Sequence, residues 1–119
     1  MTAHAAAPLK RTPIATDELS PSRAVATVHV VRLDFAPGQP TGLHKHPVPV
    51  IGYVLHGSFT VQVNGQPAHT YTEGQSIYEP ADTQIDRFDN ASKTDPATLI
   101  ATYLAGPGQK DLITFLPEK

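Results

Sequence analysis

The chain has 119 residues and no cysteine, and its nine basic and eleven acidic residues give a net charge of -2. This length predicts one domain, and the lack of cysteine excludes disulfides and thiolate metal sites. No Lys or Arg cluster marks a surface for nucleic acid or membrane, so we expect neither partner and favour a small neutral or weakly anionic molecule.

Targeting signals are missing from the given sequence. No apolar run approaches the length of a membrane-spanning helix, and the N-terminus lacks the apolar core of a signal peptide. We therefore expect a cytoplasmic protein. The segment from Ala3 to Pro8 leaves an alternative, in which it is the remnant of a processed start and a signal peptide has been removed.

The N-terminal segment, residues 1–22, shows no sustained periodicity and predicts an extended arm that precedes one domain over residues 23–119. Beyond it, Val31, Leu33 and Phe35 alternate with polar residues, which is typical of a half-buried strand. His29 has the same parity. We count it as a candidate pocket residue, although packing within a sheet is the commoner role for such a histidine.

Later segments predict further short strands. Residues 59–63 alternate and end at Asn64-Gly65, which predicts a type I′ hairpin turn and a return strand from Ala68 to Thr72. Other expected strands are 50–55, 77–78, 84–88 and 99–104. The apolar tail, residues 111–117, predicts an edge strand or a contact with a partner subunit. Short strands separated by Gly and Pro turns indicate an all-β barrel or sandwich.

One pair of residues carries a clear chemical signal. His44 and His46 are two residues apart, so in an extended chain both imidazoles point to the same face of a strand. Neutral imidazole nitrogens on one face can bind Fe, Mn, Ni, Zn or Cu, but two ligands do not complete a site. Other residues have to supply the remaining donors.

The glycine, histidine and proline spacing around this pair resembles the cupin family of barrels. The first half of the resemblance is Gly38-x5-His44-x-His46 followed by Gly57, and the second is Gly74-x5-Pro80 followed by Asn90. Within the family the chain is most similar to small single-domain members. The resemblance implies a jelly-roll-like antiparallel β-barrel with one divalent metal at its mouth, often as a homodimer. Family activities include dioxygenases, isomerases, lyases and non-catalytic ligand binding.

Two positions depart from the family pattern. Where many cupins have a ligand glutamate and a third ligand histidine, this chain has Val50 and Ile85, neither of which has a donor atom. Glu79 is the best replacement, because its spacing places it on the same face as Ile85. Asp82 is a weaker candidate because it lies in a predicted turn. Asp86 is weaker because its parity is opposite to that of Ile85.

Other side chains complete the list of candidate pocket residues. Val50, Ile85, Arg87, Tyr53 and His29 are all expected near the cavity. Arg87 shares the parity of Ile85 and would bind a carboxylate or phosphate, although an ion pair with Asp86, Asp89 or Glu79 is the commoner role. Tyrosines usually pack, but one beside a metal can donate or accept a proton.

The remaining histidines, His4, His56 and His69, lie away from the pair and are expected to be exposed or structural. Two functions follow for the pocket. The first is a metal-dependent enzyme acting on a small organic molecule. The second is a non-catalytic or vestigial cupin that binds a small ligand with weak metal or none, because the fold alone does not choose between them.

Overall fold

The structure is a computed structural model that describes residues 7–118. It confirms the all-β fold: residues 7–118 contain nine strands and no helix, and so no helix that could cross a membrane. The strands are β1 (Thr27–Phe35), β2 (His44–Lys45), β3 (Val50–His56), β4 (Ser58–Val63), β5 (His69–Thr72), β6 (Ser76–Glu79), β7 (Ile85–Asn90), β8 (Ala97–Ala105) and β9 (Thr114–Phe115).

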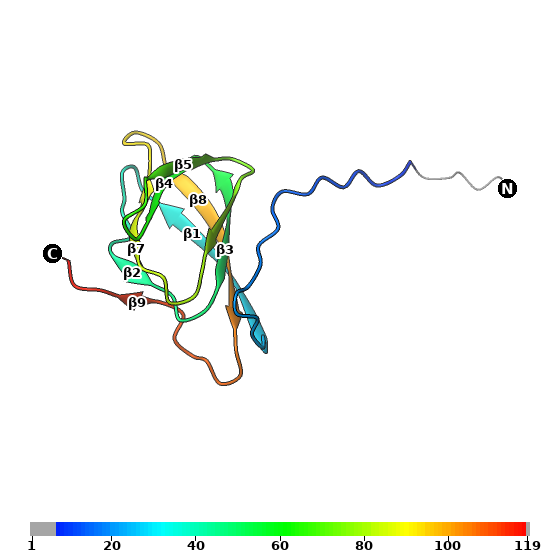
Figure 1. Ribbon diagram of the computed structural model, residues 1–119. Coiled ribbons are helices and arrows are strands. Elements are labelled where there is room, and N and C mark those ends of the chain that lie inside the picture. Colours follow the sequence, from blue (N-terminus) through cyan, green and yellow to red (C-terminus); the bar gives the residue numbers. More distant parts are fainter. Residues whose placement is uncertain (1–6, 119) are drawn as a thin grey trace.

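The strands form two antiparallel sheets that pack face to face in a jelly-roll arrangement (Figure 1). One sheet has the order β1-β8-β3-β6, and the other has the order β5-β4-β7-β2-β9. The chain passes from β3 to β4, and so from sheet to sheet, at Gly57. A β carbon on this residue would lie 2.8 Å from the Cβ of Ala97, and its φ is +78°. Only glycine fits this crossing without strain.

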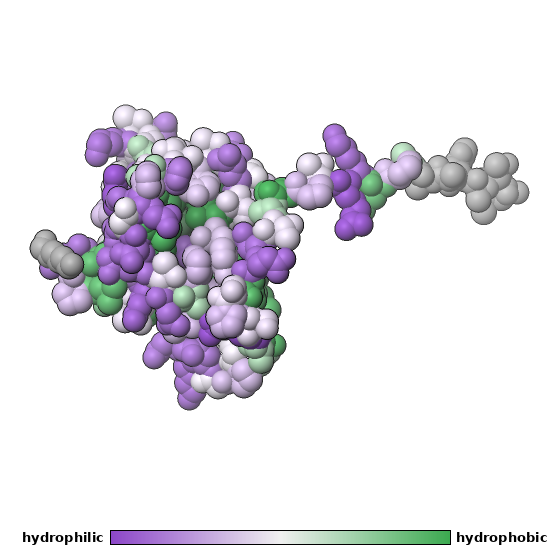
Figure 2. All heavy atoms as spheres, in the orientation of Figure 1, coloured by the Kyte–Doolittle hydropathy of each residue, from purple (hydrophilic) through white to green (hydrophobic). Residues whose placement is uncertain are grey.

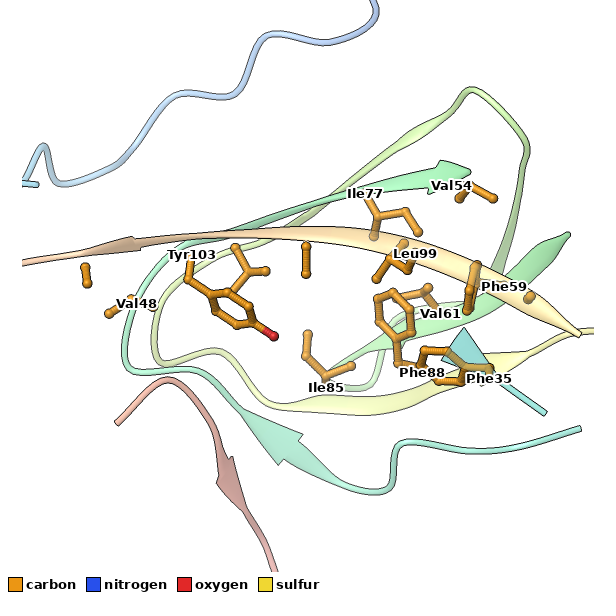
Figure 3. Close-up of a cluster of buried hydrophobic side chains, with 14 residues drawn as sticks. Phe35, Val48, Val54, Phe59, Val61, Ile77, Ile85, Phe88, Leu99 and Tyr103 are labelled. Atoms are coloured by element: carbon orange, nitrogen blue, oxygen red, sulfur yellow. The ribbon is translucent and has the colours of Figure 1, made fainter. Parts of the chain in front are cut away.

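Apolar side chains from both sheets fill one end of the barrel. Phe35, Phe59 and Phe88 form an aromatic cluster there, with ring centroids 5.0 to 6.3 Å apart (Figure 3). Burying each ring stabilises the fold by roughly 2–3 kcal/mol. The aromatic cluster closes this end to water. Tyr103 lies toward the other end (Figure 3), where it lines a cavity together with the buried residues His44, His46 and Glu79.

The β4–β5 hairpin is confirmed, but its predicted turn type is wrong. The strands are joined by residues 64–68, and Gln66 N donates to Val63 O at 2.7 Å. Gly65 has a φ of +74°, whereas Asn64 is not among the described residues with positive φ. A type I′ turn needs positive φ at both central residues. The longer loop removes the need for it.

The regular alternation of β7 is interrupted by a bulge. Gln62 of β4 pairs with Arg87, and the next residue, Val63, pairs with Ile85, so two steps along β7 match one step along β4. Such a bulge turns the following side chains relative to the preceding ones. As a result Ile85 and Phe88 are both buried while Arg87 is exposed.

The two terminal segments behave differently. In the described part of the N-terminal segment, residues 7–26 form no strand, and residues 12–17 lie beside Ile51, Tyr53 and Ser76 on the outside of the barrel. Farther toward the N-terminus the chain extends away from the barrel (Figure 1). The C-terminal tail, in contrast, pairs as an edge strand, because β9 bonds to β2. It forms one wall of the barrel mouth.

Candidate metal centre

His44 and His46 point into the barrel from the two-residue strand β2 and the residue after it. Both are buried, with 2% and 3% of their surface exposed, and their ring centroids are 4.9 Å apart. The same-face arrangement expected from their spacing is therefore present. Strand alternation directs the side chain of Lys45, which lies between them, to the opposite face.

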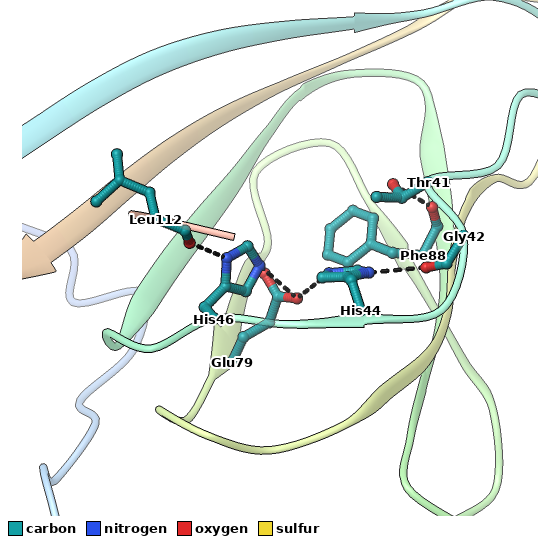
Figure 4. Close-up of polar contacts among 7 residues, drawn as sticks. All are labelled: Thr41, Gly42, His44, His46, Glu79, Phe88 and Leu112. Atoms are coloured by element: carbon teal, nitrogen blue, oxygen red, sulfur yellow. Dashed lines mark hydrogen bonds and ion pairs between the residues drawn. The ribbon is translucent and has the colours of Figure 1, made fainter. Parts of the chain in front are cut away.

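The backbone fixes which nitrogen of each ring faces the cavity. His44 Nδ1 lies 2.8 Å from the Gly42 carbonyl oxygen, and His46 Nδ1 lies 2.7 Å from the Leu112 carbonyl oxygen (Figure 4). A carbonyl only accepts, so both Nδ1 atoms carry the hydrogen and donate it. In the neutral ring the Nε2 lone pair is then free toward the cavity, as in histidines that ligate metals.

Glu79 lies opposite these rings at the end of β6. Its Oε1 atom is 3.2 Å from His44 Nε2 and 3.4 Å from His46 Nε2, and the residue is only 4% exposed (Figure 4). One ligand atom from each of the three residues lies within 4.8 Å of the other two. We call His44, His46 and Glu79 the triad.

Burial and charge act in opposite directions on the pKa values of Glu79 and His46. Burial alone raises the pKa of Glu79, but the hydrogen bonds from His44 and His46 outweigh it and hold this pKa below its ordinary value. Burial likewise lowers the pKa of His46, but its hydrogen bond to Glu79 and the carboxylate charge raise it overall. Without a metal, a proton therefore bridges an imidazole and the carboxylate.

The triad fits a divalent metal ion. Two neutral imidazole nitrogens and one carboxylate are a donor set that suits Fe(II), Mn(II), Ni(II), Zn(II) or Cu(II) and leaves positions open for a ligand. The carbonyl groups that hold both Nδ1 atoms are the outer partners that such ligands require. The triad can therefore hold a metal, and its donor set does not identify which one.

The two residues that depart from the family pattern lie beside the triad. Val50 pairs with Glu79 across β3 and β6, and Ile85 pairs with His44 across β7 and β2. Both are fully buried, with 1% and 0% of their surface exposed. The carboxylate is thus supplied from the strand next to the one that carries Val50.

Three other predicted pocket residues lie outside the cavity. Arg87 is exposed and forms an ion pair with Asp89 at 3.0 Å, because the bulge in β7 overturns the parity argument. Tyr53 is 37% exposed, since its neighbours Gly52 and Val54 occupy the inner face of β3. His29 is half-buried and pairs with Tyr103, but it does not line the cavity.

The remaining polar candidates also lie away from the triad. Asp82 is exposed at a positive φ of 58°, and Asp86 accepts hydrogen bonds from Gly65 N and the Gln84 amide. His56 and His69 are exposed, as expected. His4 lies outside the described residues.

A cavity of about 40 Å³ lies beside the triad, and it shares five lining residues, among them Tyr103 and Ile113, with a hollow of about 370 Å³ between β1 and β9. The sequence did not predict several residues that line the cavity or the hollow: Leu33, Phe35, Thr41, Tyr103, Ile113 and Phe115. The apolar character of the tail was the available signal for Ile113 and Phe115. Hydrophobic residues are visible at the surface beside β9 (Figure 2).

Tyr103 brings a phenol to the interior beside the triad. Its ring centroid is 5.6 Å from that of His46, and its hydroxyl points into the barrel (Figure 3). Burial and the Glu79 charge raise the pKa of Tyr103, so the phenol keeps its proton at neutral pH. Within residues 7–118 no other group hydrogen-bonds this hydroxyl.

The geometry can be set beside known proteins. A family model described as "Cupin domain" matches residues 31–103. Among solved structures, an oxalate oxidase in complex with the substrate analogue glycolate is 26% identical with a TM-score of 0.62 over 75% of this chain. A cupin-like protein from Thermotoga maritima is 24% identical with a TM-score of 0.63, covering 75% of this chain and 64% of that one.

A structure of DMSP lyases matches with a TM-score of 0.63 at 21% identity, covering 76% of this chain and 44% of that one, and supports the fold alone. The oxalate oxidase chain is much longer, since this chain spans 46% of it. No curated protein matches the sequence.

Proposed function

We propose that this chain, which belongs to the cupin domain family, holds one divalent metal ion in the triad and is a metal-dependent enzyme acting on a small organic molecule. The reaction classes considered are those of a dioxygenase, an isomerase or a lyase. The observation that carries the proposal is the convergence of three buried donor atoms, two of them on rings whose other nitrogen is fixed by a carbonyl group.

A metal ion bound there would act as a Lewis acid that polarises a carbonyl or activates oxygen or water. The protein has three tasks around it. The Gly42 and Leu112 carbonyl groups orient the rings of His44 and His46. Glu79 supplies the negative charge, and the aromatic cluster excludes water from the opposite end of the barrel.

One structural neighbour supports an enzyme over a vestigial binding protein. The oxalate oxidase, at 26% identity, is an enzyme by its printed description. The family resemblance implies a ligand glutamate at the position of Val50, and Glu79, which pairs with Val50, brings a carboxylate to the triad from the adjacent strand.

The proposal is tested by metal analysis of protein purified without a histidine tag. We expect about one equivalent of Fe, Mn, Ni, Zn or Cu per chain, bound natively or after addition. The double variant His44→Ala, His46→Ala should lose it. The control is His56→Ala, His69→Ala, which removes two exposed histidines and should keep the metal. A wild-type chain that binds none of these ions would contradict the proposal.

We also propose that two copies of this chain form a homodimer through β1. Within residues 7–118 this strand pairs with β8 on one side only, and Val28 and Val30 are 55% and 66% exposed on its outer face. A long unpaired edge with apolar side chains is a surface that soluble proteins usually cover. Ile14 and Leu9 on the arm are also exposed, at 57% and 84%.

Sedimentation measures the state of association directly. We expect a dimer for the wild type and a monomer for Val28→Glu, Val30→Glu. The control Thr70→Glu, on an exposed position of β5, should remain a dimer. A monomeric wild type would contradict the proposed interface.

A further inference from the structure

We infer that the hollow between β1 and β9 takes an uncharged, mainly apolar small molecule with one polar oxygen, bound by the Tyr103 hydroxyl, in preference to a carboxylate. This inference deepens the function proposed above and rests on it only for the reaction that follows binding. The side chains that line the cavity and the hollow support this choice of ligand.

The walls are apolar where a ligand would lie. Leu33 and Phe35 come from β1, and Ile113 and Phe115 come from the tail. The Phe115 ring is 62% exposed, yet its centroid is 6.3 Å from that of His44, so it stands at the entrance and can cover the body of a ligand. A hollow of about 370 Å³ has the size of a site for one small molecule.

No Lys or Arg lines the cavity or the hollow in the described part of the chain. Besides Glu79, the charged residue on the lining is Asp34, which also carries a negative charge. Arg32 is engaged with Asp34 at 3.2 Å and does not line the hollow. A carboxylate on a ligand would therefore find no Lys or Arg there, and the imidazoles of the triad already face the Glu79 carboxylate.

Electrostatics makes the difference in affinity between an uncharged ligand and a carboxylate large. A buried carboxylate without a partner costs several kcal/mol, whereas an uncharged apolar body gains from the same walls. A metal in the triad would offset the charge of a carboxylate that ligates it, so the two ligand classes are compared on the metal-free chain. There a ligand carboxylate in the hollow would lie against apolar side chains and near Asp34.

Tyr103 supplies the polar anchor. Its hydroxyl faces the interior, and among residues 7–118 it has no hydrogen-bond partner. A phenol in this position donates to a ligand oxygen without adding charge. An aromatic or aliphatic ketone, aldehyde or similar molecule meets both requirements.

The test uses two probes of nearly the same shape, acetophenone and benzoate, which differ by a methyl group in place of a charged oxygen. Binding to the full chain is measured by calorimetry after chelation and again after metal loading, with metal content determined on each sample. In the metal-free chain we expect acetophenone to bind at least tenfold more tightly than benzoate. Equal or tighter binding of benzoate there, or no binding of acetophenone, would overturn the inference.

Two variants locate the effect. Tyr103→Phe should weaken acetophenone binding about tenfold, while the control Tyr53→Phe, on the outer face, should leave it unchanged. Phe115→Lys should lower the preference for acetophenone at least fivefold by placing a cation at the entrance. The control Thr70→Lys, on an exposed position of β5 away from the hollow, should not. An unchanged preference in Phe115→Lys would place the ligand elsewhere and overturn the assignment.

The two proposals fail in different ways. A chain that prefers acetophenone but binds no metal keeps the ligand class and contradicts the proposed function. A chain that binds metal through the triad but prefers benzoate in its metal-free form keeps the metal centre and contradicts the ligand class.

Discussion

Two pairs of facing residues in the barrel differ in one instructive way. Across β3 and β6, Val50 faces Glu79, so the donor is on the second strand of the pair. Across β2 and β7, His44 faces Ile85, so the donor is on the first. Against the pattern that the family resemblance implies, the first pair has its carboxylate on β6 in place of β3, and the second pair has one histidine in place of two. Among residues 7–118 the triad therefore draws its donors from β2, the residue after it and β6.

The largest expected loss of metal affinity comes from removing the carboxylate of Glu79. Glu79→Val should lower metal affinity about 100-fold or more, because two neutral imidazoles remain with no charged ligand. The double variant Val50→Glu, Glu79→Val returns the carboxylate to β3 and should recover affinity to within about tenfold of wild type, since facing side chains lie about 5 Å apart. Competition with a chromophoric chelator measures both.

The single variant Val50→Glu is the control for this exchange. It adds a second buried carboxylate beside Glu79, so it should lower the stability of the metal-free protein by repulsion between like charges. A double variant that binds metal no better than Glu79→Val would show that the two facing positions are not equivalent.

The second pair, His44 and Ile85, is tested by placing a donor atom at position 85. Ile85→His should raise metal affinity about tenfold, or about 1.4 kcal/mol, by adding a third imidazole opposite His44. Ile85→Ala is the matched control, because it opens space without a donor and should cost roughly 2–5 kcal/mol of stability without raising affinity. Equal metal affinities in these two variants would contradict the assigned register.

The pH dependence of the metal-free protein reports on the contact between His46 and Glu79. A raised histidine pKa stabilises the fold fully below about pH 6.5 and loses its contribution as pH rises through the raised value. A lowered glutamate pKa contributes fully above about pH 4.3 and loses its contribution as pH falls through the lowered value. The contribution of this contact is therefore largest between about pH 4.3 and 6.5.

Chemical denaturation from pH 4 to 9 checks this expectation. We expect the free energy of unfolding to decrease above about pH 6.5 by on the order of 1 kcal/mol, and Glu79→Gln to remove that decrease. The metal-loaded protein should show the opposite trend over the same range, because Nε2 must be free of its proton to ligate. A metal-free wild type that gains stability above pH 6.5 would contradict the bridging proton.

The smallest effect is expected at Arg87. Arg87→Ala should change metal affinity and ligand binding less than twofold, because the guanidinium pairs with Asp89 on the exposed side of β7. Exposed ion pairs contribute about 0–1 kcal/mol to stability. A large loss of ligand binding, measured by the same calorimetry, would show that Arg87 reaches the hollow after all.

The sequence predicted the parts of this protein that depend on local pattern. Strand alternation located most strands, and the two-residue spacing placed His44 and His46 on one face. Both inferences need only a regular extended chain. Parity also selected Glu79 from three acidic candidates, but its count to Ile85 crosses residues 80–84, which form no strand, so regular alternation does not explain that success.

The inferences that failed depended on irregular or distant structure. The bulge in β7 places Arg87 on the exposed side, and no residue type in that strand indicates a bulge. The loop that joins β4 and β5, residues 64–68, is longer than the two-residue turn that Asn64-Gly65 predicts. The Leu112 carbonyl that orients His46 lies 66 residues away in sequence, so only the folded chain brings the two together.

A crystal structure of the metal-loaded protein, with anomalous scattering recorded at the edge of the bound metal, tests the central claim most directly. The account predicts one anomalous peak within about 2.0–2.2 Å of His44 Nε2, His46 Nε2 and a carboxylate oxygen of Glu79. A peak ligated by other residues, or a metal held without Glu79, would contradict it.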